Sequence, residues 1–231
     1  MAGDVAGVGW TVLAAFAVLA PALRPGYALG PYDLLSRFGL TGAPGVSVHN
    51  PAQADVIQQF VPWTRLAWQQ VHAGQVPLWN PFSILGMPLA FNWQSAPFSL
   101  PMAVSYLFPL HVAFTVVVLT KLVVAGTGAY VLCRVLGTRP LAAALGGTAF
   151  ELSGPIIVHS QWSMVGVTAW TGWILAGVVL ALRPRHRLGG CALLAVTLAL
   201  AIYGGHPESL LIVGVSCAVF LVVRLASERR S

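Results

Sequence analysis

Acidic side chains are scarce in this sequence, and one of them sits in a pattern that suits proton transfer. The six acids are Asp4, Asp33, Asp55, Glu151, Glu208 and Glu228. Gln58 and Gln59 follow Asp55 by one turn, so on a helix the amides share its face. A carboxylate flanked by amides can act as a general base on an acceptor hydroxyl. The same position equally suits a structural carboxylate in the first turn of a helix, where the dipole favours negative charge.

Two histidines and a glutamate form a second group that suits ligand binding. His159 lies in LSGPIIVHSQW, and His206 and Glu208 lie in GGHPES. On one membrane face they could bind an anionic head group or a metal, but the i, i+4 spacing of a zinc helix is missing. Involvement of a divalent metal therefore stays open. The alternative is a turn at His206-Pro207, with Glu208 stabilising the start of the next helix.

The overall composition places these residues in a membrane protein. Hydrophobic residues make up 57% of the chain and charged residues only 8%, whereas soluble domains carry about 25% charged residues. The net charge of +6 sits largely in short gaps between apolar runs, as in cytoplasmic loops of membrane proteins. This distribution argues against a nucleic-acid partner.

The apolar runs predict an all-α fold, a polytopic bundle in one transmembrane domain over 1–231. A span needs about 20 residues, and about six runs approach that length. The first is expected to be a retained span because no Lys or Arg precedes it. A long loop at 24–110 separates it from a bundle of five spans at 111–225. The expected spans are 5–23, 111–136, 141–158, 164–182, 188–204 and 208–225.

The positive charges predict the orientation of this bundle. Arginines fall between the second and third spans, between the fourth and fifth, and after the sixth, whereas the connections near 159–163 and 204–207 contain neither Lys nor Arg. Positive loops stay inside, so both termini are expected in the cytoplasm and the 24–110 loop outside. The arginines concerned are Arg134, Arg139, Arg183, Arg185, Arg187, Arg224, Arg229 and Arg230.

The long loop carries helical signals of its own. Asn50-Pro51 resembles a helix start, followed by a stripe of apolar residues at helical spacing, and Pro62 should kink this helix. Asn80-Pro81 predicts a second helix start. The tryptophans of the loop suit an element in the membrane interface. The segment 96–110 is either a re-entrant or interfacial piece or an additional span.

Two charged residues fall inside apolar runs, where charge is costly. Lys121 and Glu151 are expected to face the bundle interior or water. A pairing between them would be a structural explanation, and a functional role is the alternative. Arg65 in the loop could offset phosphate charge or contact a lipid head group.

Part of the chain resembles a known family of membrane enzymes. The run ADVIQQFVPWTRLAWQQVHAGQVPLWNPFSILGMPLAFNWQSAPFSLP resembles the first outer loop of YfhO-like bacterial membrane proteins, which look like multi-spanning glycosyltransferases of the GT-C class. PLWNP is the most specific element. LSGPIIVHSQW and GGHPES are similar to further stretches of that family. The similarity extends over most of 50–210.

The resemblance implies a transferase that takes a sugar from a polyprenyl-phosphate donor in the plasma membrane and passes it to an envelope glycopolymer or lipid on the outer face. Asp55 matches the catalytic acid residue of the first outer loop. The other positions that the resemblance implies are Gln59, Trp79, Asn80, His159 and His206. Arg65 and Glu208 join them as substrate-binding candidates because of their charge and position.

Relatives of this kind are longer, so the resemblance implies an N-terminal portion of a larger architecture, with a partner chain or further spans supplying the rest. The alternative function is non-catalytic. In that case the chain is a lipid-linked sugar binding or transport component, or a membrane scaffold.

Overall fold

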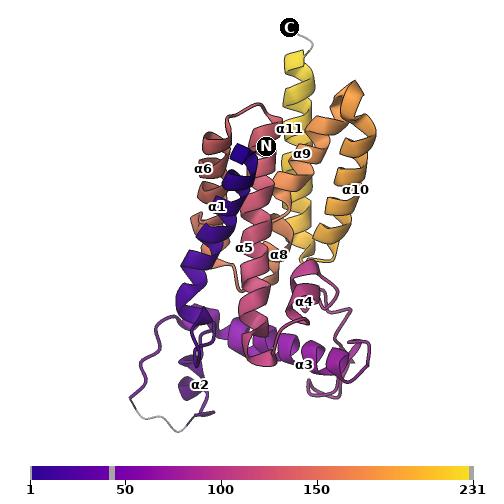
Figure 1. The fold of residues 1–231 in the computed structure, drawn as a ribbon. Coiled ribbons are helices and arrows are strands. Elements are labelled where there is room, and N and C mark those ends of the chain that lie inside the picture. The colour runs from indigo at the N-terminus through magenta and orange to yellow at the C-terminus, as the bar shows by residue number, and fades with distance from the viewer. Residues whose placement is uncertain (1, 42–44, 229–231) are drawn as a thin grey trace.

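The structure is a computed structural model that describes residues 2–41 and 45–228, and it is helical almost throughout (Figure 1). A bundle of long helices carries a set of shorter elements at one end. In chain order the elements are α1 (Ala2–Leu19), η1 (Ala20–Leu23), α2 (Leu34–Arg37), η2 (Pro51–Gln53), η3 (Val56–Phe60), α3 (Val61–His72), β1 (Trp79–Asn80), β2 (Met87–Pro88), α4 (Leu100–Ser105), α5 (Leu110–Val135), α6 (Pro140–Glu151), α7 (Gly154–Val158), α8 (Ser163–Thr168), α9 (Thr171–Leu182), η4 (Pro184–His186), α10 (Arg187–Ile202) and α11 (Pro207–Glu228).

Five helical stretches are long and apolar enough to cross a membrane. They contain between 19 and 26 residues, and at 1.5 Å per residue such lengths match a hydrocarbon core of about 30 Å. The chain is therefore an all-α membrane protein, as its composition predicts. The stretches are Ala2–Leu23, Leu110–Val135, Ser163–Leu182, Pro184–Ile202 and Pro207–Ser227.

The expected span at 141–158 is not one continuous helix. Helix α6 has 12 residues, which reach only about 18 Å, and the backbone is extended at Ser153 before α7 begins. Pro155 explains the break, because it offers no N–H and its ring clashes with the carbonyl four residues earlier, that of Glu151. Hydropathy alone does not register this interruption.

The segment 96–110 holds only the six-residue helix α4, so it does not form an additional span. Asn80-Pro81 does not start a helix either. Asn80 ends strand β1, which pairs with β2 in an antiparallel two-stranded hairpin, with Trp79 opposite Pro88 and Asn80 opposite Met87.

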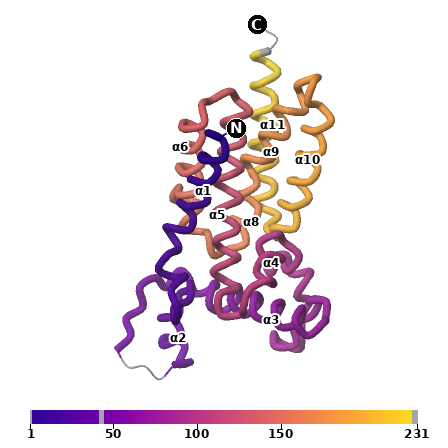
Figure 2. The backbone as a smooth tube through the Cα atoms, in the orientation of Figure 1, coloured from indigo at the N-terminus to yellow at the C-terminus, as the bar shows by residue number. Residues whose placement is uncertain are grey.

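Helix α5 forms the centre of the bundle and packs against α1, α6 and α9 (Figures 1 and 2). Small residues allow these helices to approach closely. A Cβ added at Gly147 of α6 would lie 2.7 Å from the carbonyl oxygen of Gly126 in α5, and one at Gly172 of α9 would lie 2.4 Å from the amide nitrogen of Ala129. Such small-residue contacts are typical of packing between membrane helices.

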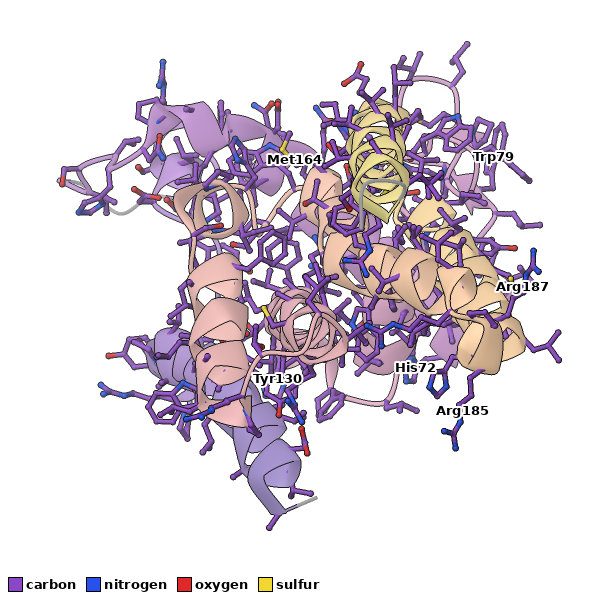
Figure 3. All side chains as sticks on the ribbon, turned by 90° about the horizontal axis from the view of Figure 1, so that it is seen from above. His72, Trp79, Tyr130, Met164, Arg185 and Arg187 are labelled. Atoms are coloured by element: carbon purple, nitrogen blue, oxygen red, sulfur yellow. The ribbon has the colours of Figure 1, made fainter. Side chains whose placement is uncertain are left out.

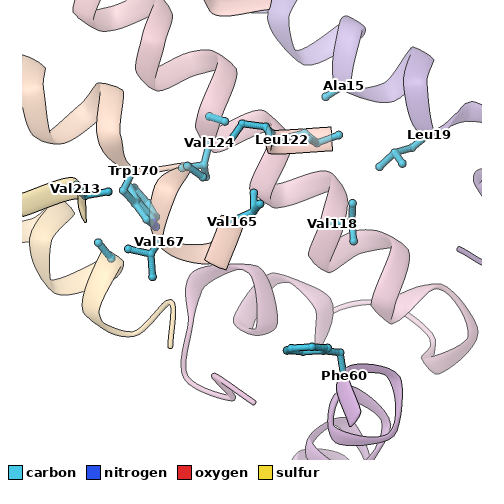
Figure 4. Close-up of a cluster of buried hydrophobic side chains, with 14 of the residues drawn as sticks. Ala15, Leu19, Phe60, Val118, Leu122, Val124, Val165, Val167, Trp170 and Val213 are labelled. Carbon is cyan, nitrogen blue, oxygen red and sulfur yellow. The ribbon is translucent and has the colours of Figure 1, made fainter. Parts of the chain in front are cut away.

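The main apolar core runs along the loop-facing half of α5 (Figure 4). Val118 and Leu122 of α5 are fully buried there, together with Ala15 of α1 and Val165 and Val167 of α8. Phe60, at the edge of the helical segment before α3, closes the core from below. The helical segment before α3 is therefore packed against the bundle through buried side chains.

The two ends of the bundle differ in their charges and elements. The start of α1, the end of α11 and the arginine-containing α5–α6 and α9–α10 connections lie at one end, and α2, α3 and α4 lie at the other (Figures 1 and 2). We call these the arginine end and the loop end. Arg229 and Arg230 lie outside the described residues.

Hydrogen bonds of arginine fix the connections at the arginine end. Arg134 Nε donates to Asp4 Oδ1 over 2.6 Å, and the hydroxyl of Tyr130 donates to the same oxygen over 3.0 Å. Arg183 Nη2 donates to the carbonyl of Val135 over 2.6 Å. These bonds tie α1 and the end of α9 to the last turn of α5.

Candidate functional site

Helix α3 lies across the loop end of the bundle (Figure 1), and the sequence specifies its unusual first turns. The Asn50 side chain accepts a hydrogen bond from the Ala52 amide at 3.1 Å, which starts the expected helical segment. A π-helical turn over Val56–Phe60 then leads into α3. Pro62 lacks an N–H and would clash with a carbonyl four residues earlier, so a widened turn before it relieves that clash.

Asp55 lies at the start of this π-helical turn and is exposed. Gln59 Nε2 donates to Asp55 Oδ1 over 3.5 Å, at the i, i+4 spacing read from the sequence. Within residues 2–41 and 45–228, Asp55 forms no ion pair with Lys, Arg or His. Its carboxylate is therefore accessible and oriented only by a neighbouring amide.

Arg65 lies ten residues further along the same helical segment and lines a groove of about 590 Å³. The groove runs between α3, the start of α5 and the segment that follows α1. His111 and Thr115 contribute from α5, and Tyr32 lines the opposite wall. Burial raises the pKa of the Tyr32 phenol, which therefore stays a neutral hydrogen-bond donor. An arginine beside a histidine suits an anionic head group.

A smaller cavity of about 30 Å³ lies next to this groove, and Thr64 and Phe114 line both spaces. It holds Lys121, whose side chain is only 6% exposed. Lys121 Nζ donates to the carbonyls of Ser160 at 3.2 Å and Trp162 at 2.9 Å. Both partners are neutral, so no carboxylate among the described residues offsets the ammonium.

Polar side chains line the cavity around Lys121. Ser163 Oγ and Gln161 Oε1 are buried and have no hydrogen-bond partner among the described residues. Buried polar groups normally find partners in protein or water, so these two atoms and the ammonium offer a binding position for a small polar group. Thr64, Gln94, Ser95 and Ser99 complete the polar lining.

The expected pairing of Lys121 with Glu151 is absent from the structure. Glu151 is fully buried, and both of its carboxyl oxygens lack partners among the described residues. Its side chain lies against Gly126, where an added Cβ would meet Oε2 at 1.8 Å. Lys121 instead reaches the turn between α7 and α8, which the break after α6 brings toward α5.

The two histidines expected at the site have local partners. His206 Nδ1 accepts from the amide of Ser209 at 3.2 Å, which caps the start of α11, and its Nε2 lies 3.7 Å from Glu208 Oε2. His159 ends α7, with Nδ1 3.0 Å from the carbonyl of Pro155 and its ring against Trp162. The structure thus contains the capped turn that was the alternative for His206 and Glu208.

Trp79 and Asn80 lie in the hairpin beside α3. The carbonyl of Trp79 accepts from Gln70 Nε2 at 2.7 Å, which fastens the hairpin to α3. Asn80 is buried: its Oδ1 accepts from the Phe82 amide, and its Nδ2 donates to Ser83 Oγ, both at 2.9 Å. These bonds make Asn80 the organiser of the turn, whereas the indole of Trp79 is half-exposed.

The structure therefore gathers the sequence-derived candidates into local groups rather than one cluster. Asp55 contacts Gln59, His206 lies beside Glu208, and only Arg65 lines the groove. Sequence reasoning did not anticipate the contribution of His111 and Ser163. Lys121 was recognisable from the cost of a charge inside an apolar run, but not its partners. The described residues hold no group of three or more His, Cys, Asp or Glu that could bind a metal ion.

The groove and the Lys121 cavity share a wall and carry cationic groups, so together they form a candidate site for an anionic ligand at the loop end. Comparison with known proteins adds no relative, since no family model, curated protein or solved structure matches this chain.

Proposed function

We propose that this chain is a membrane glycosyltransferase, or the N-terminal part of one, which moves a sugar from a polyprenyl-phosphate donor to an acceptor in the cell envelope. The observation that carries the proposal is the groove holding Arg65 and His111 beside the cavity of Lys121. In this proposal the loop end faces the outside of the plasma membrane, and both termini are cytoplasmic. The resemblance of residues 54–101 to the first outer loop of YfhO-like proteins supports the same assignment.

The reaction needs a base, a leaving group that accepts the electron pair of the broken bond, and a binding position for each substrate. The acceptor oxygen attacks the anomeric carbon of the sugar while Asp55 takes the hydroxyl proton. The bond between that carbon and the phosphate oxygen breaks, and its electron pair leaves with the polyprenyl phosphate. Arg65 stabilises the negative charge of the phosphate through charge-assisted hydrogen bonds.

The spacing along the helix suits two substrate parts rather than one point of contact. Asp55 precedes Arg65 by ten residues, which is about 15 Å along a helix. The donor phosphate would therefore lie beside Arg65, and the acceptor hydroxyl, which must reach the carbon that carries the phosphate, would lie between the side chains of Arg65 and Asp55. Gln59 would orient the Asp55 carboxylate through its hydrogen bond to Oδ1.

A non-catalytic role is the second candidate, and one observation favours it. Asp55 lines neither the groove nor the cavity, so the cationic site could bind a lipid-linked sugar without transferring it. A partner chain or further spans would then carry the chemistry.

Transfer of radiolabelled sugar from polyprenyl-phosphate donors into envelope material tests the proposal. Membranes should carry the wild type, Asp55→Asn or Asp33→Asn at equal protein levels. Asp33 is a matched control because it is also a loop carboxylate, and in the described structure its carboxylate bonds only to the backbone of Leu34 and to His49. Transfer should be lost in Asp55→Asn and kept in Asp33→Asn.

Equal transfer in Asp55→Asn and wild type would overturn the catalytic assignment. Donor binding by a wild type that transfers nothing would support the binding component instead. Loss of donor binding in Arg65→Gln is expected under both functions, because the phosphate site is common to them.

A further inference from the structure

One segment at the loop end contains no charged or histidine side chain. Between His72 and His111, residues 73–110 hold no Asp, Glu, Lys, Arg or His, and seven of them are aromatic. None of the five membrane-crossing stretches includes residues 73–109. Connecting segments in water are normally polar, so this composition is typical of chain in contact with lipid.

Leu89 and Met102 of this segment are buried in a small core cluster, but many of its other apolar side chains lie on the surface. Ile84 and Leu85 at the hairpin tip are each 97% exposed, and Phe82 is 83% exposed. Phe91 and Leu107 are also largely exposed. Large apolar side chains exposed to this degree mark an interaction site in a native protein.

The hairpin satisfies much of its own backbone, as a lipid environment requires. The Gly86 amide donates to the Ser83 carbonyl at 2.8 Å, and the Leu89 amide donates to the Leu78 carbonyl at 2.8 Å. The side chain of Asn80 accepts a hydrogen bond from the backbone amide of Phe82 through Oδ1 and donates one to Ser83 Oγ through Nδ2. The polar side chains of the turn are therefore paired with each other.

The position of the hairpin also fits a membrane surface. Viewed along the bundle, Trp79 lies at the edge of the molecule, outside the long helices (Figure 3). Hydrogen bonds from Gln70 of α3 to Trp79 and from Trp68 Nε1 to Phe108 fix both ends of the segment. The hairpin at Trp79 therefore lies beside the long helices rather than among them.

We infer that the hairpin tip formed by Phe82, Ile84 and Leu85 inserts into the adjacent lipid leaflet, and that its partner is the phospholipid bilayer itself. The absence of charge distinguishes this partner from a protein surface, for which a polar rim is usual. The uncharged segment anchors one end of α3 in the membrane, and Arg65 and His72 of the same helix remain at head-group level.

Spin labels in reconstituted vesicles test this inference. The cysteines Cys133, Cys191 and Cys217 are replaced by alanine, and a nitroxide is attached at Leu85→Cys or, as the matched water-facing control, at the exposed Arg37→Cys. The vesicles contain phosphatidylcholine and phosphatidylglycerol. Collision with oxygen, which partitions into lipid, should exceed collision with a water-soluble nickel chelate several-fold at position 85, and the reverse should hold at position 37.

Two outcomes would overturn the inference. Equal access of the nickel chelate to both positions would put the tip in water, and shielding of position 85 from both reagents would put it under protein. Phe82→Cys provides a second label position in case Leu85→Cys disturbs folding. The measurement requires no sugar transfer, so its outcome is independent of the proposed function.

Discussion

Lys121 and Trp162 are joined by a hydrogen bond of 2.9 Å that connects the middle of α5 to the turn between α7 and α8. A second bond from the same ammonium reaches the carbonyl of Ser160. The ammonium of Lys121 thus binds the backbone carbonyls of this turn. The turn lies against α5 because Pro155 interrupts the preceding helix. This arrangement gives Lys121 a structural task even before any ligand binds.

Lys121→Met should destabilise the folded protein by about 1–3 kcal/mol, because two buried carbonyls lose their donor. Thermal unfolding in detergent micelles would show this as a lower midpoint. Thr120→Val is the matched control, since the Thr120 hydroxyl bonds only to the Val116 carbonyl of its own helix. Similar midpoints for the two variants would contradict the role of Lys121.

Gly126→Ala should lower the free energy of unfolding, because the site has no room for a methyl group. The new methyl group would overlap the Glu151 carboxyl in the close contact between α5 and α6, and overpacking of this kind costs about 1–3 kcal/mol. Gly214→Ala is the control, because nothing lies within 4 Å of a Cβ added there, and alanine favours a helix by about 1 kcal/mol over glycine.

A double variant identifies the cause of that destabilisation. Glu151→Ala removes the overlapping carboxyl, so Gly126→Ala should cost much less in the Glu151→Ala background than in the wild type. Unfolding midpoints of the four proteins in this cycle provide the measurement. An unchanged cost would show that the methyl group is rejected by something other than Glu151.

Variants of His206 can distinguish a role in capping α11 from a role in ligand binding. As the residue that caps α11, it should be replaceable by asparagine, which is among the best capping residues, whereas alanine should cost about 1 kcal/mol. If His206 also binds a substrate, His206→Asn should keep the unfolding midpoint and lose donor binding. Retention of both properties would remove His206 from the site.

The contact between Asp33 and His49 predicts a pH-dependent tie in the loop. The amide of His49 donates to Asp33 Oδ2 at 2.8 Å and, with the His49 ring, holds the pKa of the Asp33 carboxyl below its ordinary 3.8. Because the pKa of Asp33 is lower in the folded state, this contact stabilises the loop at pH values above the ordinary pKa of the carboxyl. That stabilisation is lost as the pH falls through the lower folded value.

Carbon-13 NMR of labelled aspartate can follow this titration. His49→Ala should leave most of the depression of the Asp33 pKa, because the backbone amide is the largest cause. His49→Pro removes that amide and should return the pKa toward its ordinary value. Full loss of the depression in His49→Ala would assign the effect to the ring instead.

Local chemistry made part of the fold predictable from sequence. Five of the six expected spans, all except 141–158, correspond closely to long apolar helical stretches, because burial in lipid demands a near-continuous apolar run. The start of a helix at Asn50-Pro51 and the contact between Asp55 and Gln59 followed from capping and helical spacing. The break after α6 was also present in the sequence, at Ser153-Gly154-Pro155, but a search for apolar length overlooks it.

The site was less predictable because its parts come from distant segments. The partner of Lys121 depends on where the α7–α8 turn lies, and no spacing rule relates residue 121 to residues 160 and 162. Asn80-Pro81 carries the signature of a helix start, yet the Asn80 side chain satisfies a tight turn within a hairpin. Tertiary contacts decide the partners of Lys121, whereas at Asn80 the same capping side chain suits either a helix start or a tight turn.

A stretch of chain without charges also has a low free-energy cost of crossing a bilayer during synthesis of the protein. Each Lys, Arg or Asp in the middle of a membrane costs about 2.5–3.5 kcal/mol, and the segment between His72 and His111 contains none of them. If this part of the loop is exported between the first two spans, it adds no electrostatic barrier to that step. An uncharged hairpin exported in this way would meet no charge-related cost on entering the leaflet of that side.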